Sequence, residues 1–301
     1  MRDGFGIALG AGGARGWCHI GVLEALADRG FVPAGVAGCS IGALVGAAWA
    51  AHRLDALRDW ALSLTRAQML AHMDIGLGPG GVLGSGVIAR LLDRIGVPDR
   101  FEDLPRPLII VATDLASGRE VWFSKGSLHD AVRASASIPG VFRPHAISGR
   151  WYLDGGLVNP VPVSAVRALG LTRIASVRPN STVGDPFWEP KQGEGLWAQL
   201  SWPALADRLP EQVRRMLPDD VMQASTPQDG GPDYIQVITV SIDIMTEYVA
   251  ATRAAADPVD LKLEAALRQV SPLEIYRAEE GISEGRRLVE QAGDRLHKLR
   301  A

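Results

Sequence analysis

One short motif near the N-terminus has the residue types of a hydrolytic nucleophile. Gly38-Cys39-Ser40-Ile41-Gly42 has the pattern G-x-S-x-G and lies where a predicted strand passes into a predicted helix. A serine in such a turn exposes its Oγ, and Gly38 and Gly42 leave room where side chains would collide with the strand and the helix. The start of the helix also favours developing negative charge. The pattern indicates acyl chemistry at Ser40, the alternative being a chance match in a chain rich in glycine.

A second glycine-rich turn, residues 10–16, lies between the first predicted strand and the first predicted helix. A phosphate-binding P-loop would need Gly-Lys-Ser/Thr after the glycines, and none follows. A dinucleotide fingerprint would need glycine at Arg15 and an acidic residue at the end of the next strand, and both are missing. The remaining interpretation is a loop whose backbone N–H groups converge on an oxygen that becomes negative during reaction, an oxyanion hole.

A serine nucleophile also needs a base. Asp154 precedes Gly155-Gly156 and follows the apolar residues 151–153, so we expect its carboxylate to emerge at the end of a strand. An ordinary Asp-Gly-Gly turn is the alternative for these residues taken alone. The six histidines leave a further arrangement open, a triad in the chain order Ser, Asp, His made of Ser40, Asp114 and His145. No local motif supports that histidine.

The elements that must position these motifs alternate along the chain between strands and helices. We predict strands over 4–9, 32–37, 107–113, 120–124, 151–153, 173–177 and 259–263, with 107–113 and 120–124 paired across a turn. We predict helices over 18–29, 43–51, 54–64, 87–95, 128–135, 161–169, 237–256 and 272–299. Strands that alternate with helices imply a parallel sheet covered on both faces. If the turns at 10–16 and 38–42 follow adjacent strands, both open into one crevice.

Two stretches interrupt the alternation of strands and helices, although short helices at 196–209 and 211–217 are also predicted. Residues 76–86 hold six glycines and are predicted to form a loop. Residues 180–233 are rich in proline, glycine and polar residues, and they carry three tryptophans, Trp188, Trp197 and Trp202. We interpret them as an inserted segment, either a lid or a surface cap whose tryptophans pack on the main core.

Composition excludes several classes of protein. The chain has 301 residues, 47% hydrophobic and 22% charged, so it is neither disordered nor collagen-like in spite of its 34 glycines. A net charge of -3 gives no positive field for nucleic acid. The uncharged stretch 31–51 is long enough for a membrane span, but Pro33 and its glycines favour a buried strand, turn and helix. Two cysteines and no signal-peptide pattern point to the cytoplasm.

Taken together, the motifs resemble those of the patatin-like phospholipases, in particular small bacterial members related to the neuropathy-target-esterase branch. That family has a glycine-rich oxyanion loop, a G-x-S-x-G elbow and a D-G-A/G motif in this order. The sequences ATDLASGREVWFSKG, AVRASASIPGVFRPH and LVNPVPVSAVRALG are also similar. The resemblance covers residues 4–170, with a weaker likeness at SPLEIYRAEEGI, whereas residues 180–233 depart from the pattern.

The resemblance implies a three-layer α/β/α patatin-like fold with a mainly parallel central sheet, as a single domain over 1–301 with the inserted segment at about 180–233. It implies a Ser-Asp dyad without histidine, metal or cofactor, in which Ser40 is the nucleophile and Asp154 the general base and acid. The apolar approach at 151–153 suits a raised pKa of that carboxyl. The oxyanion hole would be formed by the amides of Gly12, Gly13 and Ala14.

The motifs are completed by Gly10, Arg15, Gly16, Gly38, Gly42, Gly155 and Gly156. Arg15 has two open roles, steering a phosphate head group or capping a helix. The implied activity is cleavage of acyl esters of phospholipids, lysophospholipids or related lipids, with transient contact to the membrane surface as an option for a cytoplasmic protein and with no nucleic-acid partner. The alternatives are a non-catalytic lipid-binding or regulatory protein of the same fold, a small-ester esterase, or a protease with the same dyad.

Overall fold

The computed structural model describes residues 3–72, 75–78, 81–83, 86–180, 186–188, 211 and 234–300. The chain divides into two compact units, the first formed by Met1–Val183 with Thr246–Ala301 and the second by Gly184–Met245. The predicted inserted segment at 180–233 falls almost wholly outside the described residues, so its role as a lid or cap stays a prediction.

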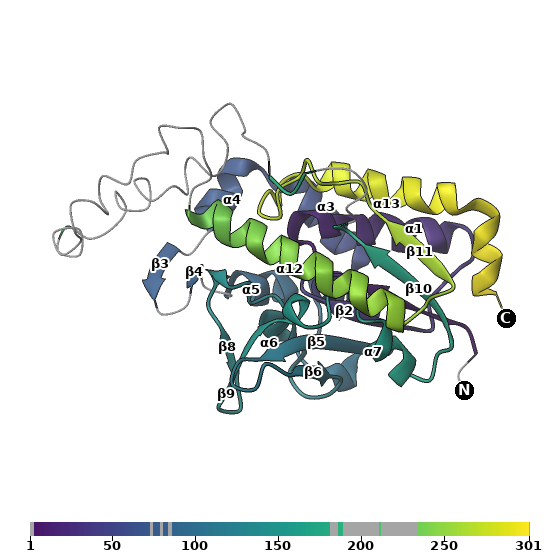
Figure 1. Ribbon diagram of the computed structural model, residues 1–301, viewed down its shortest axis with the longest axis horizontal. Helices are drawn as coiled ribbons and strands as arrows, with labels where there is room; N and C mark the ends of the chain where they lie inside the picture. Colours follow the sequence, from purple (N-terminus) through teal and green to yellow (C-terminus); the bar gives the residue numbers. More distant parts are fainter. Residues whose placement is uncertain are drawn as a thin grey trace. The chain divides into compact units, whose positions relative to one another are not determined.

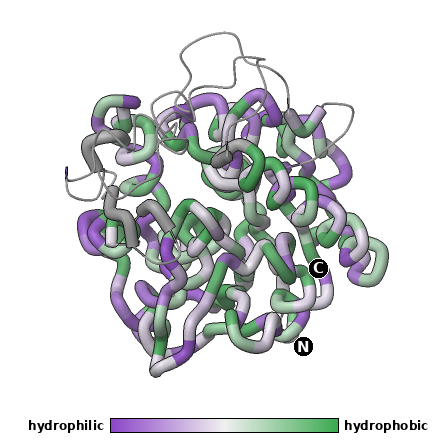
Figure 2. Tube along the Cα trace, turned by 60° about the vertical axis from the view of Figure 1, so that its left-hand side comes forward, coloured by the Kyte–Doolittle hydropathy of each residue, from purple (hydrophilic) through white to green (hydrophobic). Residues whose placement is uncertain are grey.

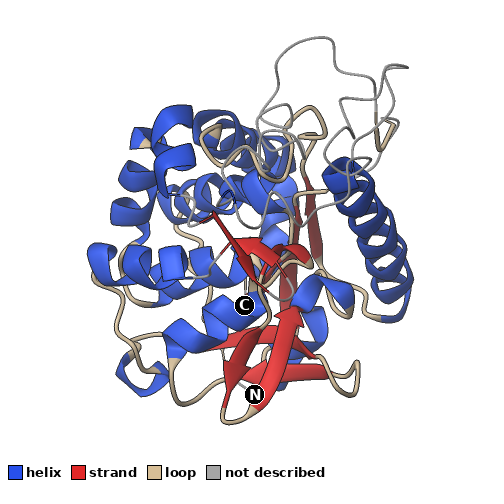
Figure 3. Cartoon of the chain, turned by 90° about the vertical axis from the view of Figure 1, so that its left-hand side faces the viewer, coloured by secondary structure: helices blue, strands red, loops and turns tan. Residues whose placement is uncertain are grey.

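A central sheet runs through the first unit (Figures 1 and 3). The strand order is β11-β10-β1-β2-β5-β9-β8, with β6 paired to β5, and every pair from β11 to β5 is parallel. The fold is therefore α/β with a mainly parallel sheet, as predicted. The strands are β1 (Phe5–Leu9), β2 (Gly35–Cys39), β5 (Leu108–Asp114), β6 (Glu120–Phe123), β8 (His145–Ile147), β9 (Arg150–Asp154), β10 (Arg173–Arg178) and β11 (Leu261–Glu264).

Helices cover both faces of this sheet. Successive strand residues point to opposite sides, and the apolar residues on each side are buried against helices. One face, including Ile7 and Leu9 of β1, packs on α1, α2 and α13, whereas Ala8 faces α7 in a second hydrophobic cluster. Figure 2 marks the hydrophobic residues of these elements in green. The helices are α1 (Cys18–Asp28), α2 (Ile41–Ala50), α3 (Leu54–Ser63), α4 (Arg66–His72), α5 (Gly86–Ile95), α6 (Leu128–Ser135), α7 (Val163–Ala168), α12 (Tyr234–Ala256) and α13 (Ala278–Ala292).

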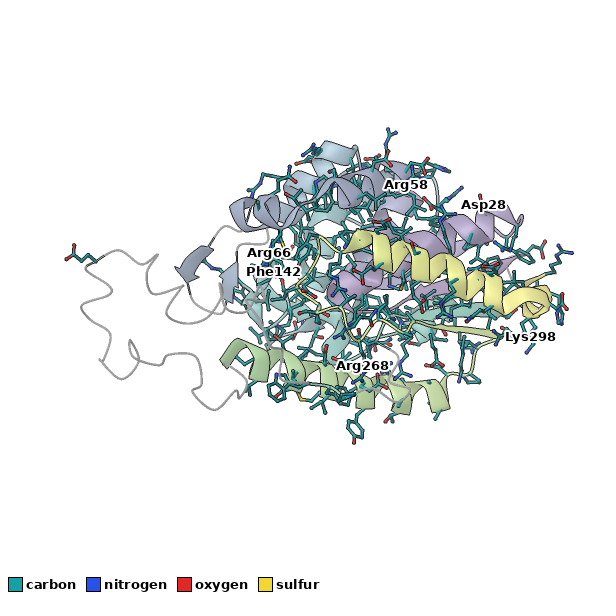
Figure 4. All side chains as sticks on the ribbon, turned by 90° about the horizontal axis from the view of Figure 1, so that it is seen from above. Asp28, Arg58, Arg66, Phe142, Arg268 and Lys298 are labelled. Atoms are coloured by element: carbon teal, nitrogen blue, oxygen red, sulfur yellow. The ribbon has the colours of Figure 1, made fainter. Side chains whose placement is uncertain are left out.

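Helix α1 is held between α3 and α13. Its Glu24 carboxylate accepts from Arg58 of α3 at 2.7 Å and also pairs with Arg286 of α13. Gly21 allows α13 to approach closely, since a Cβ there would lie 2.0 Å from the carbonyl oxygen of Ile282. Figure 4 labels Arg58 and, at the end of α1, Asp28, on the side where these helices meet. This packing fixes the helix that follows the first glycine-rich turn.

Two of the sequence predictions are wrong. Residues 76–86, expected to form a loop, contain β3 (Ile75–Gly78) and β4 (Gly81–Leu83), and β4 pairs in parallel with β7 (Gly140–Phe142). A glycine-rich stretch has no side-chain periodicity, so pairing set by a distant strand leaves no local signal. The C-terminal helix begins at Ala278 instead of residue 272 and gives way to a 3-10 helix over Gly293–Leu299.

The uncharged stretch 31–51 forms β2, a tight turn and α2, all buried in the core. Within the part of the chain that the structure describes, no helix is long and apolar enough to cross a membrane.

Candidate active site

Ser40 lies in a sharp turn between β2 and α2. Its backbone has φ 56° and ψ -121°, a left-handed conformation that a non-glycine residue adopts only under constraint. A Cβ at Gly38 would lie 2.3 Å from the carbonyl oxygen of Gly42, and a Cβ at Gly42 would lie 2.1 Å from that of Leu9. Both glycines of the motif are therefore required by close backbone approach, and the turn projects the serine side chain off the end of the strand.

Asp154 reaches the same point from the opposite direction. Strand β2 ends at Cys39, opposite Val111 of β5, and β9, antiparallel to β5, ends at Asp154, opposite Ala112. Strand β6 pairs with one edge of β5 over residues 110–113, so β2 and β9 both pair with the opposite edge. On that edge β2 ends opposite Val111 and β9 ends opposite the next residue, Ala112. The Ser40 hydroxyl donates to Asp154 Oδ2 at 2.5 Å.

The Asp154 carboxylate is otherwise held by the backbone. Its Oδ1 accepts from the Gly156 amide at 2.7 Å, and its own amide donates to the carbonyl oxygen of Ser137 at 2.9 Å. The Thr113 hydroxyl donates to the Asp154 carbonyl at 2.8 Å. One carboxylate oxygen of Asp154 is bonded to the serine, and contacts with Thr113, Ser137 and Gly156 fix the position of the residue.

Burial raises the pKa of Asp154 from its ordinary value of 3.8 to about 6, although the hydrogen bonds from Ser40 and Gly156 act to lower it. The residue is 5% exposed and Ser40 is 3% exposed. The expected apolar approach is only partly right, because Tyr152 is buried but Trp151 is 55% exposed. A carboxylate with a pKa near 6 is a better proton acceptor than an exposed aspartate and stays mostly ionised at neutral pH.

The glycine-rich loop follows β1 and lies beside this pair. A Cβ at Gly156 would lie 3.2 Å from that of Ala11, and a Cβ at Gly16 would lie 2.0 Å from Ile41 Cγ2. The loop thus runs between the start of α2 and the turn after Asp154. It brings its backbone amides to the serine end of the site.

Only some of those amides are available. The Gly10, Ala11 and Ala14 amides donate to the carbonyl oxygens of Val177, Pro160 and Pro272, at 3.0, 2.8 and 2.8 Å. Gly12 and Gly13 have no hydrogen-bond acceptor for their amides among the described residues. Of the three amides expected to form an oxyanion hole, that of Ala14 is already used in this structure, so the free donors narrow to Gly12 and Gly13.

Two buried side chains anchor the loop, and one of them was not expected. The His19 imidazole bonds through Nε2 to the Gly10 carbonyl at 2.8 Å, and burial lowers the pKa of His19 to about 4, so it donates as a neutral ring. The Arg15 guanidinium, 7% exposed, donates to the carbonyl of Val270 at 2.7 Å and to Asn180 Oδ1 at 3.0 Å. Arg15 therefore joins three chain segments, and the steering of a phosphate head group stays a prediction.

The alternative triad is not assembled. The His145 ring bonds to Asp130 at 2.8 Å, and Asp114 accepts from Ser117 and Arg150, while the Ser40 hydroxyl is directed at Asp154. Sequence reasoning missed Ser135, whose hydroxyl accepts from the Ser40 amide at 2.8 Å. The only sequence signal for it is the small-residue run ASAS, residues 134–137, at the C-terminal end of helix α6. Within the described ranges, no group of three or more His, Cys, Asp or Glu residues could hold a metal ion.

Comparisons with known proteins find a family model and several similar sequences. The family model described as patatin-like phospholipase matches residues 7–167. An NTE family protein of Mycobacterium tuberculosis, described as uncharacterised, is 34% identical over 324 residues, covering 95% of this chain and 90% of its own. Patatin-like phospholipase domain-containing protein 6 of Homo sapiens is 32% identical over 57% of this chain and 13% of its own length.

Two further matches are a longer animal protein and a solved structure. Neuropathy target esterase of Drosophila melanogaster is 31% identical over 58% of this chain and 13% of its own length. Among solved structures, VipD from Legionella pneumophila has a TM-score of 0.44 and 16% identity, covering 96% of this chain and 67% of its own. Nearly the whole chain aligns with the mycobacterial protein. Little more than half of the chain aligns with the animal proteins, and that part matches a small fraction of their much greater length.

Proposed function

Because the chain belongs to the patatin-like phospholipase family and is thus a lipid acyl ester hydrolase, we propose that it cleaves its substrate through an acyl-Ser40 intermediate with Asp154 as the base. The observation that carries the proposal is the 2.5 Å hydrogen bond from the Ser40 hydroxyl to Asp154 Oδ2, formed at a strained backbone turn. Strain of this kind is maintained where the surrounding structure fixes it, and it is concentrated at functional sites.

In the acylation step, Ser40 Oγ attacks the ester carbonyl carbon while its proton passes to Asp154 Oδ2. The carbonyl oxygen becomes negative and is bound by the amides of Gly12 and Gly13. The protonated Asp154 then gives its proton to the alcohol oxygen as the C–O bond breaks, leaving the acyl group on Ser40. A water molecule, deprotonated by Asp154, attacks the acyl carbonyl, and the released serine oxygen takes the proton back.

Three single substitutions test these roles on a short p-nitrophenyl ester. Ser40→Ala and Asp154→Asn should each abolish hydrolysis, while His145→Ala should keep it, because that ring bonds to Asp130 away from the serine. Loss of activity in His145→Ala with retention in Asp154→Asn would favour the triad instead. Retained activity in Ser40→Ala would reject the proposed nucleophile.

We also propose that the substrates are phospholipids or lysophospholipids, reached at the surface of a bilayer. The family assignment supports a lipid substrate. A lipid digest in which the protein is compared with its Ser40→Ala variant would name the class, since only lipids that differ between the two digests are substrates. Equal digests, together with full hydrolysis of the short ester, would favour a small-ester esterase.

A further inference from the structure

The hydroxyl of Ser135 makes two hydrogen bonds inside the sheet. It accepts from the backbone amide of Ser40 at 2.8 Å and donates to the carbonyl oxygen of Val111 at 2.6 Å. Ser135 is the last residue of α6 and is fully buried, with 0% of its surface exposed. A single buried side chain thus connects the backbone of the nucleophile to the neighbouring strand.

The place of this hydroxyl is explained by the register of β2 and β5. In a parallel pair, bonds recur every two residues along both strands, and here the Val36 amide donates to the carbonyl of Pro107 at 3.1 Å. With Val36 opposite Leu108 and Cys39 opposite Val111, the same step leads from the Ser40 amide to the Val111 carbonyl. The Ser135 hydroxyl stands between these two groups, bonded to each.

Because the Ser135 hydroxyl lies between the Ser40 amide and the Val111 carbonyl, β2 does not continue along β5. A continued β2 would place Ser40 opposite Ala112, and that position is held by Asp154. Instead, the chain leaves the ladder at Ser40 with φ 56°, and the serine side chain reaches Asp154. The Asp154 amide also donates to the carbonyl of Ser137, two residues beyond Ser135, so the C-terminal end of α6 and the residues just after it hold the backbones of both partners.

We propose that Ser135 is a positioning residue for the hydrolytic reaction, whose hydroxyl replaces one ladder bond and so holds Ser40 Oγ against Asp154. The inference rests on the function proposed above. Without the hydroxyl, the Ser40 amide and the Val111 carbonyl are buried with no partner, which is unfavourable. Any movement that pairs them carries Ser40 toward the position of Asp154 and disturbs the contact between the two side chains.

The test compares Ser135→Ala and Ser135→Cys with a matched control on the same helix. The control is Ser127→Ala, which removes a hydroxyl that caps the start of α6 by accepting from the Asp130 amide at 3.1 Å, far along the helix from the elbow. On the p-nitrophenyl ester, Ser135→Ala should lower kcat at least tenfold with KM within twofold of the parent. Ser135→Cys, with a weakly bonding thiol, should fall between, and Ser127→Ala should keep kcat in spite of a lower Tm.

A pH profile separates positioning from a loss of folded protein. The bond from Ser40 lowers the pKa of Asp154, so its loss in Ser135→Ala should move the acidic limb of kcat/KM to higher pH. An unchanged kcat in Ser135→Ala would overturn the inference. So would a fall in kcat that Ser127→Ala shows equally and that leaves the acidic limb of kcat/KM in place. The Ser40→Ala variant distinguishes the two levels: if it stays active, the proposed function fails, and if it is inactive while Ser135→Ala is fully active, only the positioning role fails.

Discussion

The two glycine-rich turns of the site follow adjacent parallel strands, yet they are held in different ways. At the elbow around Ser40, the close contacts are between Gly38 and Gly42 of the motif itself and the end of the neighbouring strand at Leu9. The loop over residues 10–16 is instead bound by carbonyl groups of segments far along the chain, which are Val177, Pro160, Pro272 and Val270. The elbow places one side chain, whereas the loop leaves certain amides free.

The placement of the nucleophile and the choice of free amide donors therefore depend on different parts of the sequence. At the elbow, the glycines of the motif itself allow the turn, and one side chain from another element, Ser135, binds the Ser40 amide. A loop held from outside has its free donors chosen by whichever distant carbonyls take the others, as Pro272 takes the amide of Ala14. We expect substitutions to disrupt the two turns by different routes and to different extents.

The largest effect is expected for Gly42→Ala at the elbow. The new Cβ would lie 2.1 Å from a backbone oxygen of β1, so the turn must shift and Ser40 must leave Asp154. We expect kcat/KM to fall about a thousandfold and the free energy of unfolding to fall by about 2 kcal/mol.

Gly46→Ala is the matched control, since it adds the same atom to the same helix, where the nearest neighbour is the Leu108 Cδ1 methyl at 3.1 Å. Ester kinetics and urea unfolding measure both variants. Equal losses in the two would show that the elbow has no special demand for glycine.

A smaller effect is expected for Gly13→Ala in the loop. Gly13 has φ +55°, and a Cβ there would lie 2.3 Å from the carbonyl oxygen of Pro272. The displaced loop loses one of the two proposed oxyanion donors, which should lower kcat about a hundredfold. Gly30→Ala, at φ +77° with nothing within 4 Å of its Cβ, isolates the backbone strain and should leave kcat unchanged. A Gly13→Ala enzyme with parental kcat would remove the loop from the reaction.

The smallest effect concerns stability and is confined to the elbow. The folded pKa of Asp154, about 6, exceeds its ordinary value of 3.8, so the folded state holds the proton more tightly than the unfolded state. The stability that this gives is present below pH 4 and is lost as pH rises through 6. His19 beneath the loop, with a pKa of about 4, stays neutral over the upper part of this range.

Asp154→Asn removes the titration. Relative to the parent, its free energy of unfolding should rise by about 2 kcal/mol between pH 4 and pH 7. Urea unfolding of both proteins across this range provides the measurement. A difference that does not change with pH would show that the Asp154 pKa is not raised.

Much of the elbow could be predicted from the sequence, and much of the loop could not. Gly38, Ser40 and Gly42 define a turn by their own spacing, and helix α6 is confirmed at the predicted residues 128–135. The use of the Ala14 amide depends on a carbonyl in the C-terminal part of the chain, which no local pattern reveals. Ser135 was missed for a similar reason, because its partners are backbone atoms of two other elements.

We propose that Ser40, activated by Asp154 and by no histidine, becomes acylated during the reaction. Labelling with a fluorophosphonate, followed by tryptic digestion and mass spectrometry, tests it directly, because Ser40 is the only hydroxyl-bearing residue in the peptide 30–53. We predict one adduct, on that peptide, absent in Ser40→Ala, strongly slowed in Asp154→Asn and retained in His145→Ala. An adduct on another peptide, or labelling that is equally fast in Asp154→Asn, would contradict the claim.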